Sequence, residues 1–229
     1  MSSEPLARNL AATQARIAAA AMRYGRTPQS VQLLAISKGQ PASAVRLIAE
    51  AGQRDFGENY VQEALDKIAA LDRLALTWHF TGQIQGNKTR PIAEHFAWVH
   101  TLDRERIAIR LNEQRPHHAP PLNICVQVSL EDEPGKGGVE PREVAQLAAR
   151  VCALPRLRLR GLMCIPPHRD TFEEQLGLFL RMSECFADLE AQGFDLDTLS
   201  MGMSGDLEAA VAAGATLVRV GTAIFGERI

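Results

Sequence analysis

Residues 198–220, TLSMGMSGDLEAAVAAGATLVRV, decide the fold of this chain. Two short apolar runs, 198–201 and 216–220, flank a helical pattern at residues 206–213. Runs that are apolar on both faces are typical of strands buried within a parallel sheet. Gly214 directly follows the helical pattern, where a glycine commonly ends a helix. The segment therefore predicts a strand, a helix and a second strand parallel to the first.

The same alternation runs through the rest of the chain. The expected strands are residues 31–37, 54–56, 76–82, 97–101, 122–129, 157–165, 198–201 and 216–220. The helical patterns between them are residues 42–51, 60–70, 88–95, 104–113, 141–153, 172–192 and 206–213. Eight strands that alternate with helices are typical of a parallel sheet closed as a barrel. We therefore expect an α/β fold, a single (β/α)8 TIM barrel.

We expect residues 1–229 to form one domain, because no Pro/Gly/Ser-rich linker divides them. A doubly wound open sheet is the structural alternative. It would favour a G-x-G-x-x-G loop after the first strand, and the sequence has none there. Only residues 222–229 follow the last strand, so an extra N-terminal helix at residues 4–24 is expected to complete the outer ring.

The composition excludes several classes of function. The net charge of −2 gives no electrostatic basis for binding nucleic acid or an anionic membrane. The N-terminus lacks the pattern of a signal peptide, and no apolar run approaches the roughly 20 residues that span a bilayer. The four cysteines show no C-x-x-C spacing and are expected to be buried free thiols. The sequence therefore predicts a cytoplasmic protein without a metal site.

Function in such barrels gathers at the C-terminal ends of the strands, and the first strand ends in A-I-S-K-G. Lys38 is therefore expected at the barrel mouth. A lysine there can extend to solvent or pair with a carboxylate. It can also form a Schiff base, since an amine becomes nucleophilic when it is desolvated or placed near positive charge.

Three further strand ends carry polar residues whose roles the sequence leaves open. Glu58 and Asn59 follow the second strand, where they can cap the next helix. Asn59 can alternatively form a hydrogen bond with a ring hydroxyl group of a ligand. His79 alternates with Trp78 and Phe80, so it is expected to point into the barrel, as a core residue or as a ligand. The loop EDEPGKGGV at residues 131–139 is either a solvated loop or a lid that brings Lys136 to an anion.

Small residues follow the seventh and eighth strands. Ser204 and Gly205 precede a helical pattern, whose first N–H groups attract anions. Gly221 and Thr222 follow the eighth strand and offer further N–H and hydroxyl donors. Because barrels commonly hold a phosphate between these two loops, the pair predicts a phosphate site.

Arg219 lies in the otherwise apolar run L-V-R-V-G-T, so its charge must be paired or directed at a ligand. An arginine that faces a pyridine nitrogen keeps this nitrogen unprotonated and makes the ring a weaker electron sink. A strand-one lysine, a phosphate site and a strand-eight arginine together match a site for pyridoxal 5'-phosphate (PLP).

Five motifs in order resemble the YggS/PROSC family of PLP-binding homeostasis proteins and, more distantly, the barrel domain of alanine racemases. They are LLAISK, FGENYVQE, WHFTGQIQGNK, GLMCIP, and SMGMSGD followed by VRVGTAIFG. The resemblance implies that Lys38 carries PLP, that Ser204, Gly221 and Thr222 hold its phosphate, and that Arg219 faces the ring nitrogen. Asn59 and His79 lie in matching motifs near the ring. Gly135 and Gly137 stand where the family usually has a polar residue.

The resemblance also implies a role in vitamin B6 and amino-acid homeostasis without catalysis, as a carrier or regulator. Alanine racemases use a tyrosine base from an additional domain. We expect no such domain here, and the two tyrosines of the sequence, Tyr24 and Tyr60, do not lie where that domain would place one. We expect a monomer whose partners are PLP and PLP-dependent apo-enzymes. The alternatives are a PLP enzyme with weak racemase or lyase activity, and a cofactor-free phosphosugar enzyme.

Overall fold

Eight parallel strands close into a barrel in the computed structural model, which describes residues 3–131 and 137–226. Each strand pairs with the next along the chain, and the first pairs with the eighth. The strands are β1 (Gln32–Ile36), β2 (Asp55–Glu58), β3 (Thr77–Phe80), β4 (Trp98–Leu102), β5 (Leu122–Gln127), β6 (Leu157–Met163), β7 (Thr198–Ser200) and β8 (Leu217–Val220). The expected TIM barrel is confirmed.

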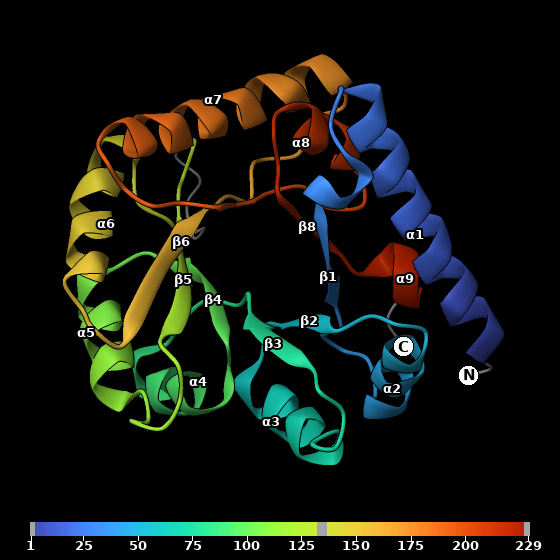
Figure 1. Ribbon diagram of the computed structural model, residues 1–229, viewed down its shortest axis with the longest axis horizontal. Coiled ribbons are helices and arrows are strands. Elements are labelled where there is room, and N and C mark those ends of the chain that lie inside the picture. Colours follow the sequence, from blue (N-terminus) through green and yellow to red (C-terminus); the bar gives the residue numbers. More distant parts are fainter. Residues whose placement is uncertain (1–2, 132–136, 227–229) are drawn as a thin grey trace.

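Helices surround the barrel (Figure 1). They are α1 (Ser3–Arg23), α2 (Ala42–Glu50), α3 (Val61–Ala70), α4 (Thr89–His95), α5 (Glu105–Gln114), α6 (Val144–Cys152), α7 (Phe172–Ala191), α8 (Leu207–Ala212) and α9 (Thr222–Phe225). Three 3-10 helices are η1 (Pro28–Ser30), η2 (Gly86–Lys88) and η3 (Pro141–Glu143). The extra helix α1 packs on α2, α8 and α9, which confirms that it completes the outer ring.

The apolar faces of the helices pack against the outside of the strands and form one continuous core. The barrel also buries polar side chains, which come from successive strands or directly follow them. Fully buried polar residues include Ser37, Glu58, His79, His100 and Ser200. Buried polar groups must be hydrogen-bonded to be tolerated. His79, His100 and Ser200 bond one another inside the barrel, whereas Ser37 and Glu58 bond Lys67 of helix α3 between the strands and the helix layer.

Gly82, two residues after the end of β3, allows a close approach of two backbone segments at the barrel mouth. A Cβ at Gly82 would lie 2.1 Å from the carbonyl oxygen of Asn59. No side chain fits at this distance, so glycine lets the end of β3 pack against the backbone that presents Asn59.

The expectation that all four cysteines are buried is wrong in detail. Cys152 is exposed at the end of α6 and Cys185 is half-buried, whereas Cys125 and Cys164 are buried as expected. The Arg160 guanidinium in β6 stacks 4.5 Å from the Trp98 ring centroid and pairs with Asp197. A register shift between β5 and β6 lies at this point of the strand.

Candidate functional site

A pocket of about 280 Å³ lies at the C-terminal mouth of the barrel. Its lining brings together Ile36, Lys38, Gln40, Asn59, Thr81, Ile165, Met203, Ser204, Gly205, Arg219, Gly221, Thr222, Phe225 and Gly226. Six of the seven expected site residues are in this set. The loops after β1, β2, β7 and β8 therefore converge on one cavity, as the barrel topology requires.

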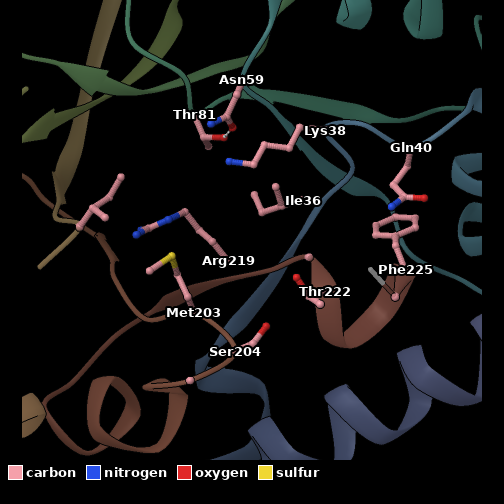
Figure 2. A pocket seen from close by; sticks show the side chains of 14 residues that line it. Ile36, Lys38, Gln40, Asn59, Thr81, Met203, Ser204, Arg219, Thr222 and Phe225 are labelled. Atoms are coloured by element: carbon pink, nitrogen blue, oxygen red, sulfur yellow. Dashed lines mark hydrogen bonds between the residues drawn. The ribbon is translucent and has the colours of Figure 1, made fainter. Parts of the chain in front are cut away.

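Lys38 directs its side chain into this pocket. Figure 2 shows it extending between the Asn59–Thr81 pair and Arg219. Its backbone belongs to a turn closed by a 3.0 Å bond from the Gln40 N–H to the Ser37 carbonyl. Gly39 occupies the third position of this turn with φ +74°, a conformation that favours glycine. The turn ends β1 abruptly and aims Lys38 across the mouth.

Asn59 and Glu58 do not cap helix α3, so that interpretation is wrong. The residue at the N-cap position is Tyr60, and it makes no side-chain cap bond. Asn59 Oδ1 instead accepts a 2.8 Å bond from the Thr81 hydroxyl, and both residues line the pocket. Glu58 turns away to bond Ser37 and Lys67. Asn59 thus faces the pocket with its amide nitrogen available as a donor.

The loops after β7 and β8 supply the small polar residues of the expected phosphate site. The hydroxyl groups of Ser204 and Thr222 turn toward the space between the two loops (Figure 2). A Cβ at Gly221 would lie 3.1 Å from the Ile36 carbonyl oxygen, so glycine keeps this loop close to β1. Helix α8 begins at Leu207 and has only six residues, so loop N–H and hydroxyl groups, more than a helix dipole, define the site.

Arg219 reaches the pocket from β8 and is only 5% exposed. Its guanidinium donates to the Ser200 carbonyl at 2.8 Å, the Ser200 hydroxyl at 2.9 Å and the Cys164 carbonyl at 2.8 Å. These bonds fix the orientation of the guanidinium plane. Burial lowers the pKa of Arg219, but an arginine remains charged at any physiological pH. The pocket therefore contains a fixed positive charge.

His79 is fully buried beneath the pocket and does not line it, so it is not placed to contact a ligand there. Its Nε2 lies 3.1 Å from Asp55 Oδ1, and its Nδ1 lies 2.9 Å from His100 Nε2. His100 Nδ1 lies 2.9 Å from the Ser200 hydroxyl, which Arg219 also bonds. A chain of hydrogen bonds thus joins Asp55, at the start of β2, to Arg219 in the pocket.

Both histidines in this series of hydrogen bonds, His79 and His100, are held neutral. Burial lowers the pKa of His79 and lowers that of His100 further, and the neighbouring His79 and Arg219 also lower the pKa of His100. Asp55 accepts a hydrogen from His79 Nε2, which leaves His79 Nδ1 to accept from His100. His100 Nδ1 then accepts from Ser200. Each hydrogen bond in the series from Ser200 to Asp55 is therefore donated in the direction of Asp55.

These depressed pKa values predict acid lability. An unfolded histidine binds a proton near pH 6.5, whereas the folded chain resists protonation at His79 and His100. The unfolded state then binds more protons, so stability is full above about pH 6.5 and falls as the pH drops below it. The limit is about 1.4 kcal/mol per pH unit for each histidine. Urea unfolding at pH 7.5, 6.5 and 5.5 measures this loss.

The exposed His168 provides the matched control for this prediction. His168→Gln should keep the acid sensitivity of the wild type, and His100→Gln should reduce it. Equal pH slopes for the wild type and His100→Gln would show that His100 is not held neutral. Burial raises the pKa of Glu58, so this residue makes the folded state more stable as the pH falls. Its contribution is the same in all three proteins and cancels when their pH slopes are compared.

The sequence interpretation missed part of the site. Gln40, Thr81, Met203 and Phe225 line the pocket, and His100 and Ser200 support Arg219 from below. The run W-V-H-T-L places His100 inward by the same alternation that places His79, so this signal was present. Residues 132–136 fall outside the described part of the chain, so the interpretation of Lys136 and Gly135 as parts of a lid stays a prediction.

Neither a metal site nor a membrane-spanning helix is found among the described residues. In residues 3–131 and 137–226, no group of three or more His, Cys, Asp or Glu side chains could hold a metal ion. Across the same residues, no helix combines the length and apolarity that a transmembrane segment needs.

Comparisons with known proteins show which proteins this chain resembles. The alanine racemase N-terminal domain family matches residues 9–229. A pyridoxal phosphate homeostasis protein of Escherichia coli is 53% identical over 226 residues, which are 97% of each chain. A protein of the same name from Pseudomonas aeruginosa is 56% identical over 223 residues, 97% of this chain and 96% of that protein.

Solved structures extend the comparison. PipY of Synechococcus elongatus, solved with PLP bound, superposes with a TM-score of 0.84 at 40% identity, over 96% of this chain and 100% of that chain. An alanine racemase of Bacillus anthracis superposes with a TM-score of 0.70 at 18% identity, over 98% of this chain and 56% of that chain. The racemase therefore shares the fold alone.

Proposed function

The chain belongs to the family of the pyridoxal phosphate homeostasis proteins, built on the alanine racemase N-terminal domain, and on this premise we propose that it binds PLP. The amine of Lys38 condenses with the PLP aldehyde to form a Schiff base, and one water leaves. The protein acts in PLP and amino-acid homeostasis as a carrier or regulator. Residues 1–229 serve this function as one barrel domain.

One observation carries this proposal: Lys38, at the end of β1, lines a single pocket with Ser204, Arg219 and Thr222, which lie far from it in the sequence around β7 and β8. The donors match the chemistry of the ligand. Ser204, Thr222 and the backbone of Gly205 and Gly221 suit the phosphate of PLP. An amine suits its aldehyde, and a fixed cation suits an unprotonated ring nitrogen.

Six residues of the pocket have proposed roles. Lys38 is the covalent anchor. Ser204, Gly221 and Thr222 hold the phosphate, Arg219 donates to the ring nitrogen, and the amide of Asn59 bonds the ring hydroxyl. His79 keeps no direct role, because it supports Arg219 through His100 and Ser200.

The lining of the pocket supports a carrier more than an enzyme. Bound PLP supplies an electron sink for α-carbanions, and racemisation through it needs a proton donor or acceptor on each face of the substrate. Among the described residues that line the pocket, Lys38 and Arg219 are the only titratable ones. Tyr60 is 63% exposed at the start of α3, and neither it nor Tyr24 lines the pocket. Lys38 is thus the only base that the described lining offers.

Transfer of PLP to an apo-enzyme tests the proposed function. The loaded protein is mixed with a PLP-dependent apo-enzyme, and recovery of its activity is compared with the rate at which PLP is released into free solution. A carrier delivers PLP faster than release alone allows. Exchange of the α-hydrogen of amino acids for deuterium, with multiple turnovers by the loaded protein, would instead indicate a weak racemase or lyase.

We also propose a cytoplasmic monomer. All four cysteines are free, which supports a reducing compartment. Light scattering coupled to size-exclusion chromatography tests the oligomeric state, and a dimer mass would contradict this proposal.

Helix α1 should contribute to PLP affinity although it lies outside the pocket. Arg16 donates to the Ser204 carbonyl at 2.8 Å and pairs with Glu208, so it ties α1 to the loop after β7. Arg16→Met frees this loop, and we expect about threefold weaker PLP binding, since the lost bond is partly exposed to water. Fluorescence titration measures the change, with the exposed Arg90→Met as control. Unchanged affinity would show that the loop is held without α1.

A further inference from the structure

Lys67 is a buried cation whose partners all belong to the region around Lys38. Its side chain is 5% exposed, and its ammonium donates three hydrogen bonds. They go to the Ser37 carbonyl at 2.6 Å, Glu58 Oε1 at 2.7 Å and Glu63 Oε1 at 2.6 Å. An ammonium has three N–H groups, so all are used. We call Glu58, Glu63 and Lys67 the clamp.

The two carboxylates of the clamp also bond the segment that carries Lys38. Glu58 Oε1 accepts a 2.6 Å bond from the Ser37 hydroxyl. Glu63 Oε1 accepts a 2.5 Å bond from the Gly39 N–H. Helix α3 and strand β2 therefore hold the loop after β1 through ionised groups, whose hydrogen bonds are stronger than those between neutral groups.

These contacts fix the backbone of Lys38 from both sides. The Ser37 carbonyl belongs to the peptide unit before Lys38, and the Gly39 N–H belongs to the unit after it. Because the orientation of two successive peptide units defines φ and ψ of the residue between them, the clamp determines where the Lys38 side chain starts. The Gln40 to Ser37 turn bond and the positive φ of Gly39 maintain the same shape.

From this geometry we infer that Glu63, Lys67 and Glu58 are positioning residues for Lys38. They hold the Ser37–Gln40 turn, so the backbone of Lys38 is already ordered when its amine meets an aldehyde in the pocket. Such ordering otherwise reduces affinity, since it lowers the conformational entropy of the loop. The inference rests on the proposed function and assigns a role to the motif F-G-E-N-Y-V-Q-E, beyond Asn59.

Charge burial explains why the clamp is built from three groups. Burial raises the pKa of Glu58, and Lys67 opposes this shift. Glu58 Oε2 is buried and, within the described part of the chain, has no hydrogen-bond partner. Removing Lys67 would leave Glu58 uncompensated and would destabilise the fold itself. Glu63 is 30% exposed and so can be changed with less effect on folding.

The experiment therefore compares Glu63→Ala with Glu63→Gln. The glutamine keeps an oxygen that accepts from the Gly39 N–H, and the alanine removes it. Asp66→Ala, exposed on the same helix, is the matched control. Each variant is titrated with PLP and with pyridoxine 5'-phosphate, whose alcohol cannot form a Schiff base, and the Schiff-base absorption gives the rate of condensation.

We expect Glu63→Ala to bind PLP about tenfold more weakly and to condense more slowly, with most of both effects recovered in Glu63→Gln. Binding of pyridoxine 5'-phosphate should stay unchanged, because the phosphate and ring contacts do not use the clamp. Two results would overturn the inference alone: wild-type PLP binding by Glu63→Ala, or an equal loss for both ligands. A wild-type protein that forms no Schiff base would overturn the proposed function as well.

Discussion

Lys38→Ala is expected to abolish the Schiff-base absorption of the PLP-loaded protein and to weaken PLP binding by more than about tenfold. The substitution removes the amine that condenses with the aldehyde but leaves the phosphate loops and Arg219 in place. Absorption spectroscopy across a PLP titration measures both effects. The half-buried alkyl chain makes a small contribution to packing, so the variant should fold.

Two controls accompany this prediction. Lys38→Ala should bind pyridoxine 5'-phosphate as the wild type does, because that ligand forms no covalent bond. Lys88→Ala, an exposed lysine on the outer surface, should keep the Schiff-base absorption. Persistence of the absorption in Lys38→Ala would place the anchor elsewhere. Absence of any such absorption in the wild type would favour the cofactor-free phosphosugar enzyme.

Arg219→Glu is expected to have the second large effect, on both stability and spectrum. A carboxylate at this position would face the Ser200 and Cys164 carbonyl oxygens that now accept from the guanidinium. Breaking such buried charged contacts typically costs about 3–5 kcal/mol of folding free energy. The variant also replaces a cation with an anion near the ring nitrogen, which should then bind a proton. The pH dependence of the loaded protein's absorption should change accordingly.

Arg219→Gln keeps the test decisive if the glutamate variant does not fold. Glutamine can still donate to one carbonyl, and it removes the positive charge without adding a negative one. It should shift the absorption in the same direction as glutamate, by less. If folded variants show wild-type spectra and wild-type PLP affinity, Arg219 does not face the ring nitrogen.

The positions of Lys38 and Arg219 could be predicted because they depend on local pattern. The apolar runs define the strands, the strands define a barrel, and a barrel brings the C-terminal strand ends to one mouth. The resemblance to PLP-binding homeostasis proteins is confirmed by the relatives. The convergence of Ser204 and Thr222 on Lys38 depends on strand order alone, so it too was open to sequence reasoning.

The supporting contacts could not be predicted, because they depend on distances between side chains of different elements. Glu58 precedes a helix, which suggested a cap, but the buried Lys67 ammonium and the Ser37 hydroxyl give it stronger partners. His79 points inward as expected, yet only the neighbouring strand shows that His100 lies between it and the pocket. The alternation of residues along a strand predicts to which face a side chain points, but not how far it lies from the pocket.

The central claim, that Lys38 anchors PLP, is tested most directly by trapping the bond. The protein is incubated with PLP, reduced with borohydride to convert the C=N bond to a stable amine, digested and analysed by mass spectrometry. The chain has four lysines, at positions 38, 67, 88 and 136, so the attachment site is resolved without ambiguity. The account predicts a pyridoxyl group on Lys38 in nearly all modified chains. Stoichiometric modification of Lys67, Lys88 or Lys136, or no modification at all, would contradict it.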